Sequence, residues 1–221
     1  MSKRLVGPAH RDTVRTPLDA VRDGFRFGNR FVLSLRWPVG HRVLRIAYGL
    51  CGGMCLAAVD YKRGDVPLPA LTAPPAWGSP LHRYLLRRQW DSWRWMGVPL
   101  RTLFWMLLSR RQLTRRTLEG ELPRILAALE KGTPQVLLLL RAKGGDPTEN
   151  HQVVAIGYER PAESELLTLF LYDPNHPGRE VELWVDTSGT TSPPMHQSTG
   201  EALRGFFRIG YRPRTPRVSE S

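Results

Sequence analysis

The sequence predicts a single α+β domain, in which a helical first half that contains both cysteines packs on an antiparallel sheet formed by the second half. Apolar residues recur at helical spacing between residues 81 and 131. Short runs of β-branched and large apolar residues follow from residue 135 onward. Helices first and strands later favour this class over an alternating parallel-sheet fold, and 221 residues suit one domain.

The first part of the chain predicts an arm, an extended segment and a helix. Residues 1–22 are polar, basic and without periodicity, so we expect a flexible arm. Residues 25–35 (FRFGNRFVLSL) alternate apolar and polar side chains at first and predict a strand or extended segment, interrupted at Gly28-Asn29. A glycine-rich turn then leads into a helix that begins near Cys51.

A proline-rich loop and further helices follow. Residues 64–80 contain five prolines and cannot form a regular element, so they predict a rigid surface loop. Helical spacing predicts two helices within residues 81–116, separated at residues 97–99. Residues 121–131 predict another helix, closed by Gly132, the residue type preferred just beyond a helix end.

The second half predicts short strands between turn signals. They are residues 135–140 (QVLLLL), 152–158 (QVVAIGY), 166–172 (LLTLFLY) and 181–185 (VELWV). Residues 212–221 have the composition of a solvated, flexible tail, so we place the single domain at residues 23–211.

The charge of the chain is strongly positive. Thirty-two Lys and Arg, nearly all of them arginines, outnumber 20 Asp and Glu and give a net charge of +12. Such a surface suits an acidic partner and leaves nucleic acid open as a second choice. The most apolar stretch, residues 98–108, contains Arg101 and is shorter than the ~20 residues of a membrane-spanning helix, so it predicts a core helix. The start lacks an apolar segment, so we expect a cytoplasmic protein or export without a Sec signal.

Two cysteines lie four residues apart at Cys51 and Cys55. On a helix this spacing aims their side chains poorly for a disulfide, and a reducing compartment with a free thiol is expected. Together with His151 or His176 they have the ligand types of a zinc site. Structural zinc sites favour closer cysteines and need a fourth ligand, so we expect neither a metal nor another cofactor.

Cys51 has the surroundings of a reactive thiol. The positive end of a helix and a nearby histidine stabilise a thiolate, and Cys51 is predicted at a helix start. The glycines around it, Gly49, Gly52 and Gly53, leave backbone N–H groups free to point at a developing oxyanion.

The best candidate for the base is His151, which opens the strand NHQVVAIGY. The next strand ends in Tyr172-Asp173-Pro174-Asn175, so an antiparallel hairpin would bring Asp173 beside His151. A carboxylate there fixes the imidazole tautomer and stabilises its cation.

These motifs resemble the papain-like cysteine protease superfamily, in which a cysteine heads a helix and a histidine opens a strand. The order Cys51, His151, Asp173 is similar too. The strand ending in Asp-Pro, and the helix followed by GTPQVL before it, resemble the bacteriocin-processing peptidases of the double-glycine type. The resemblance covers roughly residues 45–65 and 120–180 and implies a papain-like fold with a Cys-His-Asp triad.

Two features of the site stay open at this point. The superfamily usually places an oxyanion-hole glutamine shortly before the cysteine, and no glutamine precedes Cys51. Asn29, Asn175 and the backbone of Gly52 and Gly53 are therefore the candidates for positioning substrate. Cys55 is the alternative nucleophile.

The sequence thus predicts a cysteine hydrolase that acts on a peptide or amide bond of a peptide or protein substrate. The same triad serves deamidation and transglutamination. A non-catalytic protein of this fold that binds nucleic acid or an acidic partner through its arginines is the alternative from another class.

Overall fold

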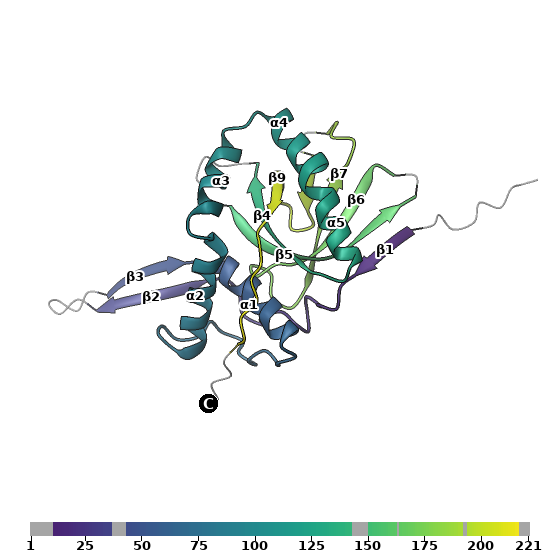
Figure 1. Ribbon diagram of the computed structural model, residues 1–221. Coiled ribbons are helices and arrows are strands. Elements are labelled where there is room, and N and C mark those ends of the chain that lie inside the picture. Colours follow the sequence, from purple (N-terminus) through teal and green to yellow (C-terminus); the bar gives the residue numbers. More distant parts are fainter. Residues whose placement is uncertain (1–10, 37–42, 143–149, 163, 192–193, 217–221) are drawn as a thin grey trace, which may run out of the picture.

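A computed structural model describes residues 11–36, 43–142, 150–162, 164–191 and 194–216 (Figure 1). Three short strands precede the first helix, but from there on helices come first and strands later as the sequence predicts, which makes the domain α+β. In order, the elements are β1 (Arg11–Arg15), β2 (Phe31–Arg36), β3 (Val43–Tyr48), α1 (Cys51–Arg63), α2 (Pro80–Trp93), α3 (Gly97–Met106), α4 (Arg110–Arg115), the π-helical segment η1 (Arg116–Glu121), α5 (Leu122–Glu130), β4 (Gln135–Arg141), β5 (His151–Pro161), β6 (Leu166–Tyr172), β7 (Glu180–Asp186), β8 (Met195–Gln197) and β9 (Ala202–Arg208).

The second half folds into a closed antiparallel sheet. Its strand order is β1-β5-β4-β9-β8-β7-β6, and β5 also pairs with β6, so β4 to β9 close on themselves while β1 is added beside β5. Closure removes the exposed edges that an open sheet would leave. The strands β2 and β3 form a separate ribbon, which projects from the body in Figure 1.

Three groups of buried apolar residues hold the elements together. One fills the sheet beneath α5 and includes Ile125, Leu137 and Phe206. A second joins α1 and α3 to the other side of the sheet. The third lies around α1 and α2 and contains Phe25 and Phe27. Helix α1 therefore lies at the centre of the molecule.

Small side chains allow α1 to lie between the sheet and α2. Residues Gly52 to Tyr61 are all buried, and five of these ten are Gly, Ala or Cys. A Cβ on Gly53 would lie only 2.2 Å from the backbone oxygen of Leu85 in α2. The two helices can approach this closely only because Gly53 has no side chain.

A buried ionic cluster ties the C-terminal segment to these helices. The Nε of Arg88 lies 2.7 Å from Oδ2 of Asp60, and the side chains of both residues are at most 1% exposed. The hydroxyls of Tyr84 and Tyr211 each donate to the Asp60 carboxylate at 2.7 Å, and the backbone N–H of Arg214 donates at 3.0 Å. Each buried charge thus has several partners, as burial demands.

The ends of the domain differ from the sequence prediction. Arg11–Arg15, expected in a flexible arm at 1–22, form β1, and Leu18 is buried. Residues 212–216, expected in a flexible tail at 212–221, are held against the helices, because Arg214 bonds to Asp60 and to Asp91. The predictions for residues 1–10 and 217–221 lie outside the described residues.

The helices between residues 80 and 121 also differ from the prediction. The break lies at residues 94–96, and Gly97-Val98-Pro99 instead begin α3. Helix α4 and η1 were not predicted, and neither were β3, β8 and β9. The expected core helix at 98–108 buries only one face, that of Val98, Thr102 and Trp105. No helix within the described ranges is long and apolar enough to cross a membrane.

Candidate active site

Cys51 is the first residue of α1. Its neighbour Leu50 is the N-cap, and the Leu50 N–H donates to Oδ1 of Asn29. Cys51 as a residue is half-buried, and it lies at the end of the helix where unpaired N–H groups concentrate positive potential. This is the position that the sequence predicted for it.

The hairpin β5–β6 brings His151 and Asp173 together, as predicted. Because Val154 pairs with Tyr172, the start of β5 and the end of β6 lie at the same end of the hairpin. The Nε2 of His151 lies 2.6 Å from Oδ1 of Asp173, and both side chains are buried. The N–H of Asn175 also donates to this carboxylate oxygen, at 2.8 Å.

The charges of these three residues support one another. Burial alone would raise the pKa of the Cys51 thiol, but a hydrogen bond and the charge of His151, with the N–H groups of Gln152 and Gly52, lower it below its usual value. Burial disfavours the His151 cation, yet the charge of Asp173, its hydrogen bond and Cys51 raise the pKa of His151 to about 10. Despite burial, His151 lowers the pKa of Asp173. The arrangement favours a thiolate beside an imidazolium.

Cys55 lies one turn further along α1 in a different environment. It is fully buried, and its Sγ donates to the backbone oxygen of Gln152 at 3.3 Å. Burial, with the charges of Cys51 and Asp173, raises its pKa well above the usual value. The two cysteines are both free thiols, but only Cys51 is placed where its thiolate is stabilised.

The two candidate asparagines lie against the triad and against each other. Asn29 Nδ2 donates to Oδ1 of Asn175 at 3.2 Å, and a Cβ on Gly49 would touch the Asn29 amide. The Nδ2 of Asn175 lies 3.4 Å from Nδ1 of His151. It can donate there only when Nδ1 carries no proton. Asn29 thus bridges the residue before Cys51 and the loop after Asp173.

The two candidate glycines have different surroundings. The N–H of Gly52 points to the Cys51 sulfur, as its influence on the thiol pKa shows. The N–H of Gly53 instead donates to Oε1 of Gln89 at 2.9 Å, inside the protein. Gly53 is therefore wrong as an oxyanion donor, because its N–H is already bonded and its role is to pack α1 against α2.

Three polar residues around Gly52 were not predicted from the sequence. A Cβ on Gly52 would lie 2.3 Å from Ser92 Oγ and 2.4 Å from Gln152 Oε1, and Gln89 lies beside Ser92. Within the described part of the chain, Gln152 Oε1 is buried and has no hydrogen-bond partner. Gln152 could have been found from the sequence, because it directly follows His151. Ser92 and Gln89 could not, because no sequence signal links them to Cys51.

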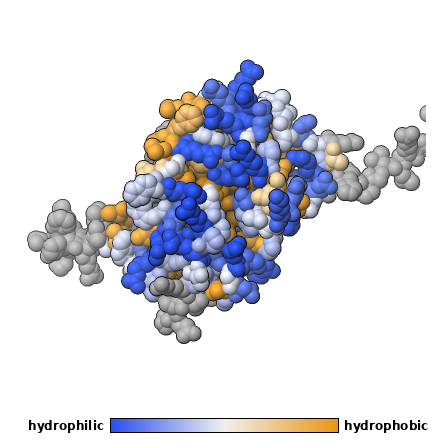
Figure 2. Space-filling view, in the orientation of Figure 1, coloured by the Kyte–Doolittle hydropathy of each residue, from blue (hydrophilic) through white to orange (hydrophobic). Residues whose placement is uncertain are grey.

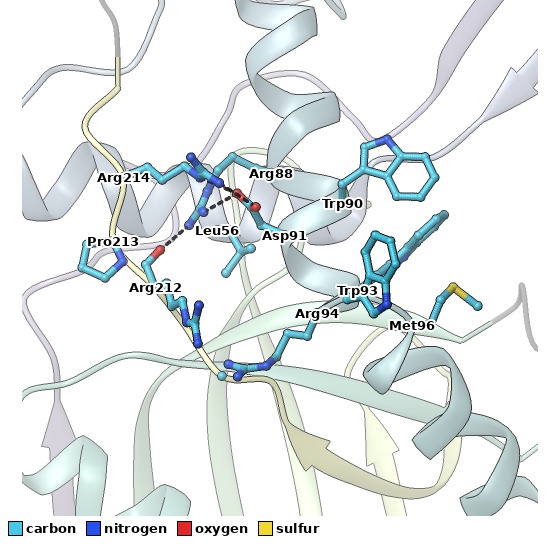
Figure 3. A pocket seen from close by; sticks show the side chains of 12 residues that line it. Leu56, Arg88, Trp90, Asp91, Trp93, Arg94, Met96, Arg212, Pro213 and Arg214 are labelled. Atoms are coloured by element: carbon cyan, nitrogen blue, oxygen red, sulfur yellow. Dashed lines mark hydrogen bonds and ion pairs between the residues drawn. The ribbon is translucent and has the colours of Figure 1, made fainter.

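The triad does not line the cavity beside α2. A cavity of about 960 Å³ lies between the end of α2 and the C-terminal segment, and Trp90, Trp93 and Arg212 are among its lining residues (Figure 3). In the described ranges, no three His, Cys, Asp or Glu side chains gather closely enough to hold a metal ion. Cys51, Cys55 and His151, which have the ligand types of a zinc site, do not form such a group.

Comparison with known proteins gives no relative. No family model matches the chain, and no curated protein or solved structure is significantly similar to it.

Proposed function

We propose that the chain is a papain-like cysteine hydrolase that cleaves a peptide or side-chain amide bond. The observation that carries the proposal is the pairing of His151 with Asp173 through Nε2, which leaves Nδ1 for the thiol of Cys51. A cysteine at a helix start, a histidine at a strand start and a carboxylate on the next strand are also the features by which the sequence resembles that superfamily.

The chemistry follows from the protonation states. The Cys51 thiolate attacks the carbonyl carbon, and the His151 imidazolium gives its proton to the leaving amine as the C–N bond breaks. Water then attacks the thioester while His151 takes its proton, which releases the acid and restores the thiolate. Asp173 keeps the imidazole oriented and stabilises its cation throughout.

The oxyanion that forms in each step needs donors beside Cys51. The Gly52 N–H and one N–H of the Asn29 amide are the groups in this region that serve it in our proposal. Asn175 keeps Asn29 in place through its Oδ1. This arrangement replaces the glutamine that the superfamily usually supplies.

Thiol alkylation at mildly acidic pH tests the reactive centre. An ordinary cysteine at pH 6 is only ~0.3% thiolate, so a low-pKa thiol stands out as fast iodoacetamide labelling. We expect fast labelling of the wild type and of Cys55→Ala, and its loss in Cys51→Ala. In His151→Ala it slows at least about tenfold, since each unit of pKa changes the thiolate tenfold.

Turnover tests the hydrolase itself. A peptide library analysed by mass spectrometry, with and without an amine as competing acceptor, separates hydrolysis from transglutamination and deamidation by the mass of the product. The Cys51→Ala protein is the matched control. The proposal of amide cleavage is wrong if the wild type is labelled no faster than free cysteine. It is also wrong if Cys51 is labelled fast but the peptide library stays unchanged.

A further inference from the structure

Helix α3 is apolar on the side that faces water. Val98, Thr102 and Trp105 point into the protein. The residues at helical spacing on the other side are Leu100, Leu103, Phe104 and Leu107, with exposed fractions of 62%, 45%, 50% and 85%. A helix that is apolar all round is normally covered on all sides. Figure 2 shows the resulting hydrophobic area over α3.

The turn before α3 enlarges this area at the expense of backbone strain. Arg94, Trp95 and Met96 all have positive φ, between 45° and 65°, although none is glycine. This conformation is unfavourable for residues with a side chain. It leaves Trp95 94% exposed, while the side chain of Arg94 lies against Gly210 of the C-terminal segment. A strained backbone that presents a tryptophan to solvent is typical of a binding surface.

Positive charge surrounds the apolar area. Residues 80–116, which run from α2 through α4, contain nine arginines and a single carboxylate, Asp91. That carboxylate is paired with Arg88 and Arg214. Arg116 lies over the ring of Phe104, with its guanidinium carbon 5.3 Å from the ring centroid. Residues 94–116, which we call the α3 surface, therefore combine the apolar area with six arginines and no carboxylate.

From this surface we infer that the protein docks on an anionic lipid bilayer, with α3 lying in the plane of the membrane interface. Tryptophan, phenylalanine and leucine enter the boundary between headgroups and acyl chains, and arginines around them contact lipid phosphates. Nucleic acid fits less well, because leucines do not stack on bases. An acidic protein surface would pair with the arginines but would leave Leu100, Leu103 and Leu107 in contact with water.

Sedimentation with vesicles tests the inference on the full chain. We expect the wild type to bind vesicles of phosphatidylcholine with about 30% phosphatidylglycerol, and to bind pure phosphatidylcholine at least about tenfold more weakly. The Cys51→Ala protein binds as the wild type does, because docking needs no thiol. Failure of catalysis and failure of docking are thus separate results.

Matched variants assign the binding to the α3 surface. Leu103→Gln/Leu107→Gln removes two apolar side chains and should weaken binding at least about tenfold. Leu71→Gln/Leu166→Gln, at leucines that are 42% and 48% exposed elsewhere on the protein, should leave binding unchanged. Thermal unfolding at the wild-type temperature shows that each variant is folded.

Charge variants supply the second arm. Arg110→Gln/Arg111→Gln should weaken binding to anionic vesicles about tenfold or more, whereas Arg124→Gln/Arg160→Gln, exposed on other elements, should have a much smaller effect. Equal loss in the two arginine pairs, or equal binding by the two leucine pairs, overturns the inference. The inference is also overturned if the wild type does not bind anionic vesicles and light scattering instead shows a dimer that dissociates in Leu103→Gln/Leu107→Gln.

Discussion

Replacing Gly53 by alanine should destabilise the protein, because the missing side chain at Gly53 is what lets α1 touch α2. The new Cβ would lie 2.2 Å from the backbone oxygen of Leu85 and 3.1 Å from the backbone nitrogen of Gln89. Neither atom is on a flexible side chain, so the helices must separate by about 1 Å to reach ordinary contact distance.

The size of the effect follows from three contributions. Overpacking of this kind costs about 1–3 kcal/mol. Separation of the helices also weakens the hydrogen bond from the Gly53 N–H to Gln89, which contributes about 1 kcal/mol. Alanine regains about 1 kcal/mol through its higher helix propensity. The net loss is about 1–3 kcal/mol, a fall in Tm of roughly 2–12 °C for a chain of this size.

Thermal unfolding followed by circular dichroism measures this fall, with Gly120→Ala as the control. Gly120 is also helical, but a Cβ there meets nothing within 4 Å, so its replacement should keep or raise Tm. If Gly53→Ala melts within about 1 °C of the wild type, the helices do not need this glycine, and the close α1–α2 contact is wrong.

Three further predictions concern charge and hydrogen bonding. Turnover needs a Cys51 thiolate and a protonated His151, so initial rates should fall in acid as the thiol protonates and fall again as pH rises through about 10, where His151 loses its proton. A flat alkaline limb would contradict the ion pair. Asp60→Asn leaves Arg88 without its buried charge partner and should cost about 3 kcal/mol in urea unfolding. Exposed Asp65→Asn is the control, and equal midpoints would refute the claim. Asn29→Ala removes the side-chain donor that our proposal gives to the oxyanion and should lower turnover about 100-fold, while the rate of Cys51 alkylation, which forms no oxyanion, stays nearly unchanged; Asn29→Asp, which also lacks this donor, should not restore turnover.

The sequence predicts the strands of the second half well because their signals are local. The run 166–172 forms β6 with the same limits, and 135–140 forms most of β4. The hairpin between His151 and Asp173 follows from two neighbouring runs and a short turn, so proximity along the chain places both residues. Cys51 is found by the glycines around it and by the start of a helix, which are local signals as well.

Contacts between distant segments could not be predicted. Val14 pairs with Tyr158, so β1 is a strand only because β5 lies beside it. Its own polar sequence gives no strand signal. The sequence around Gly53 does not tell whether its N–H is free for an oxyanion or bonded inside the protein. The position of α2 decides this, because it brings the side chain of Gln89 to that N–H. The break at 94–96 was missed because three non-glycine residues adopt positive φ there, a choice that propensity disfavours and tertiary contacts impose.

The pairing of β1 with β5 sets an order of events during synthesis. Arg11 pairs with Pro161, so about 150 residues must be made after β1 before its partner exists. At translation rates of about 5–20 residues per second, β1 waits roughly 7–30 s without a neighbouring strand. Cys51 likewise precedes His151 and Asp173, so the helix that carries the thiol leaves the ribosome long before the residues that activate it. In our proposal the nascent chain therefore carries an ordinary cysteine, which becomes reactive only when the last strands of the closed sheet have formed.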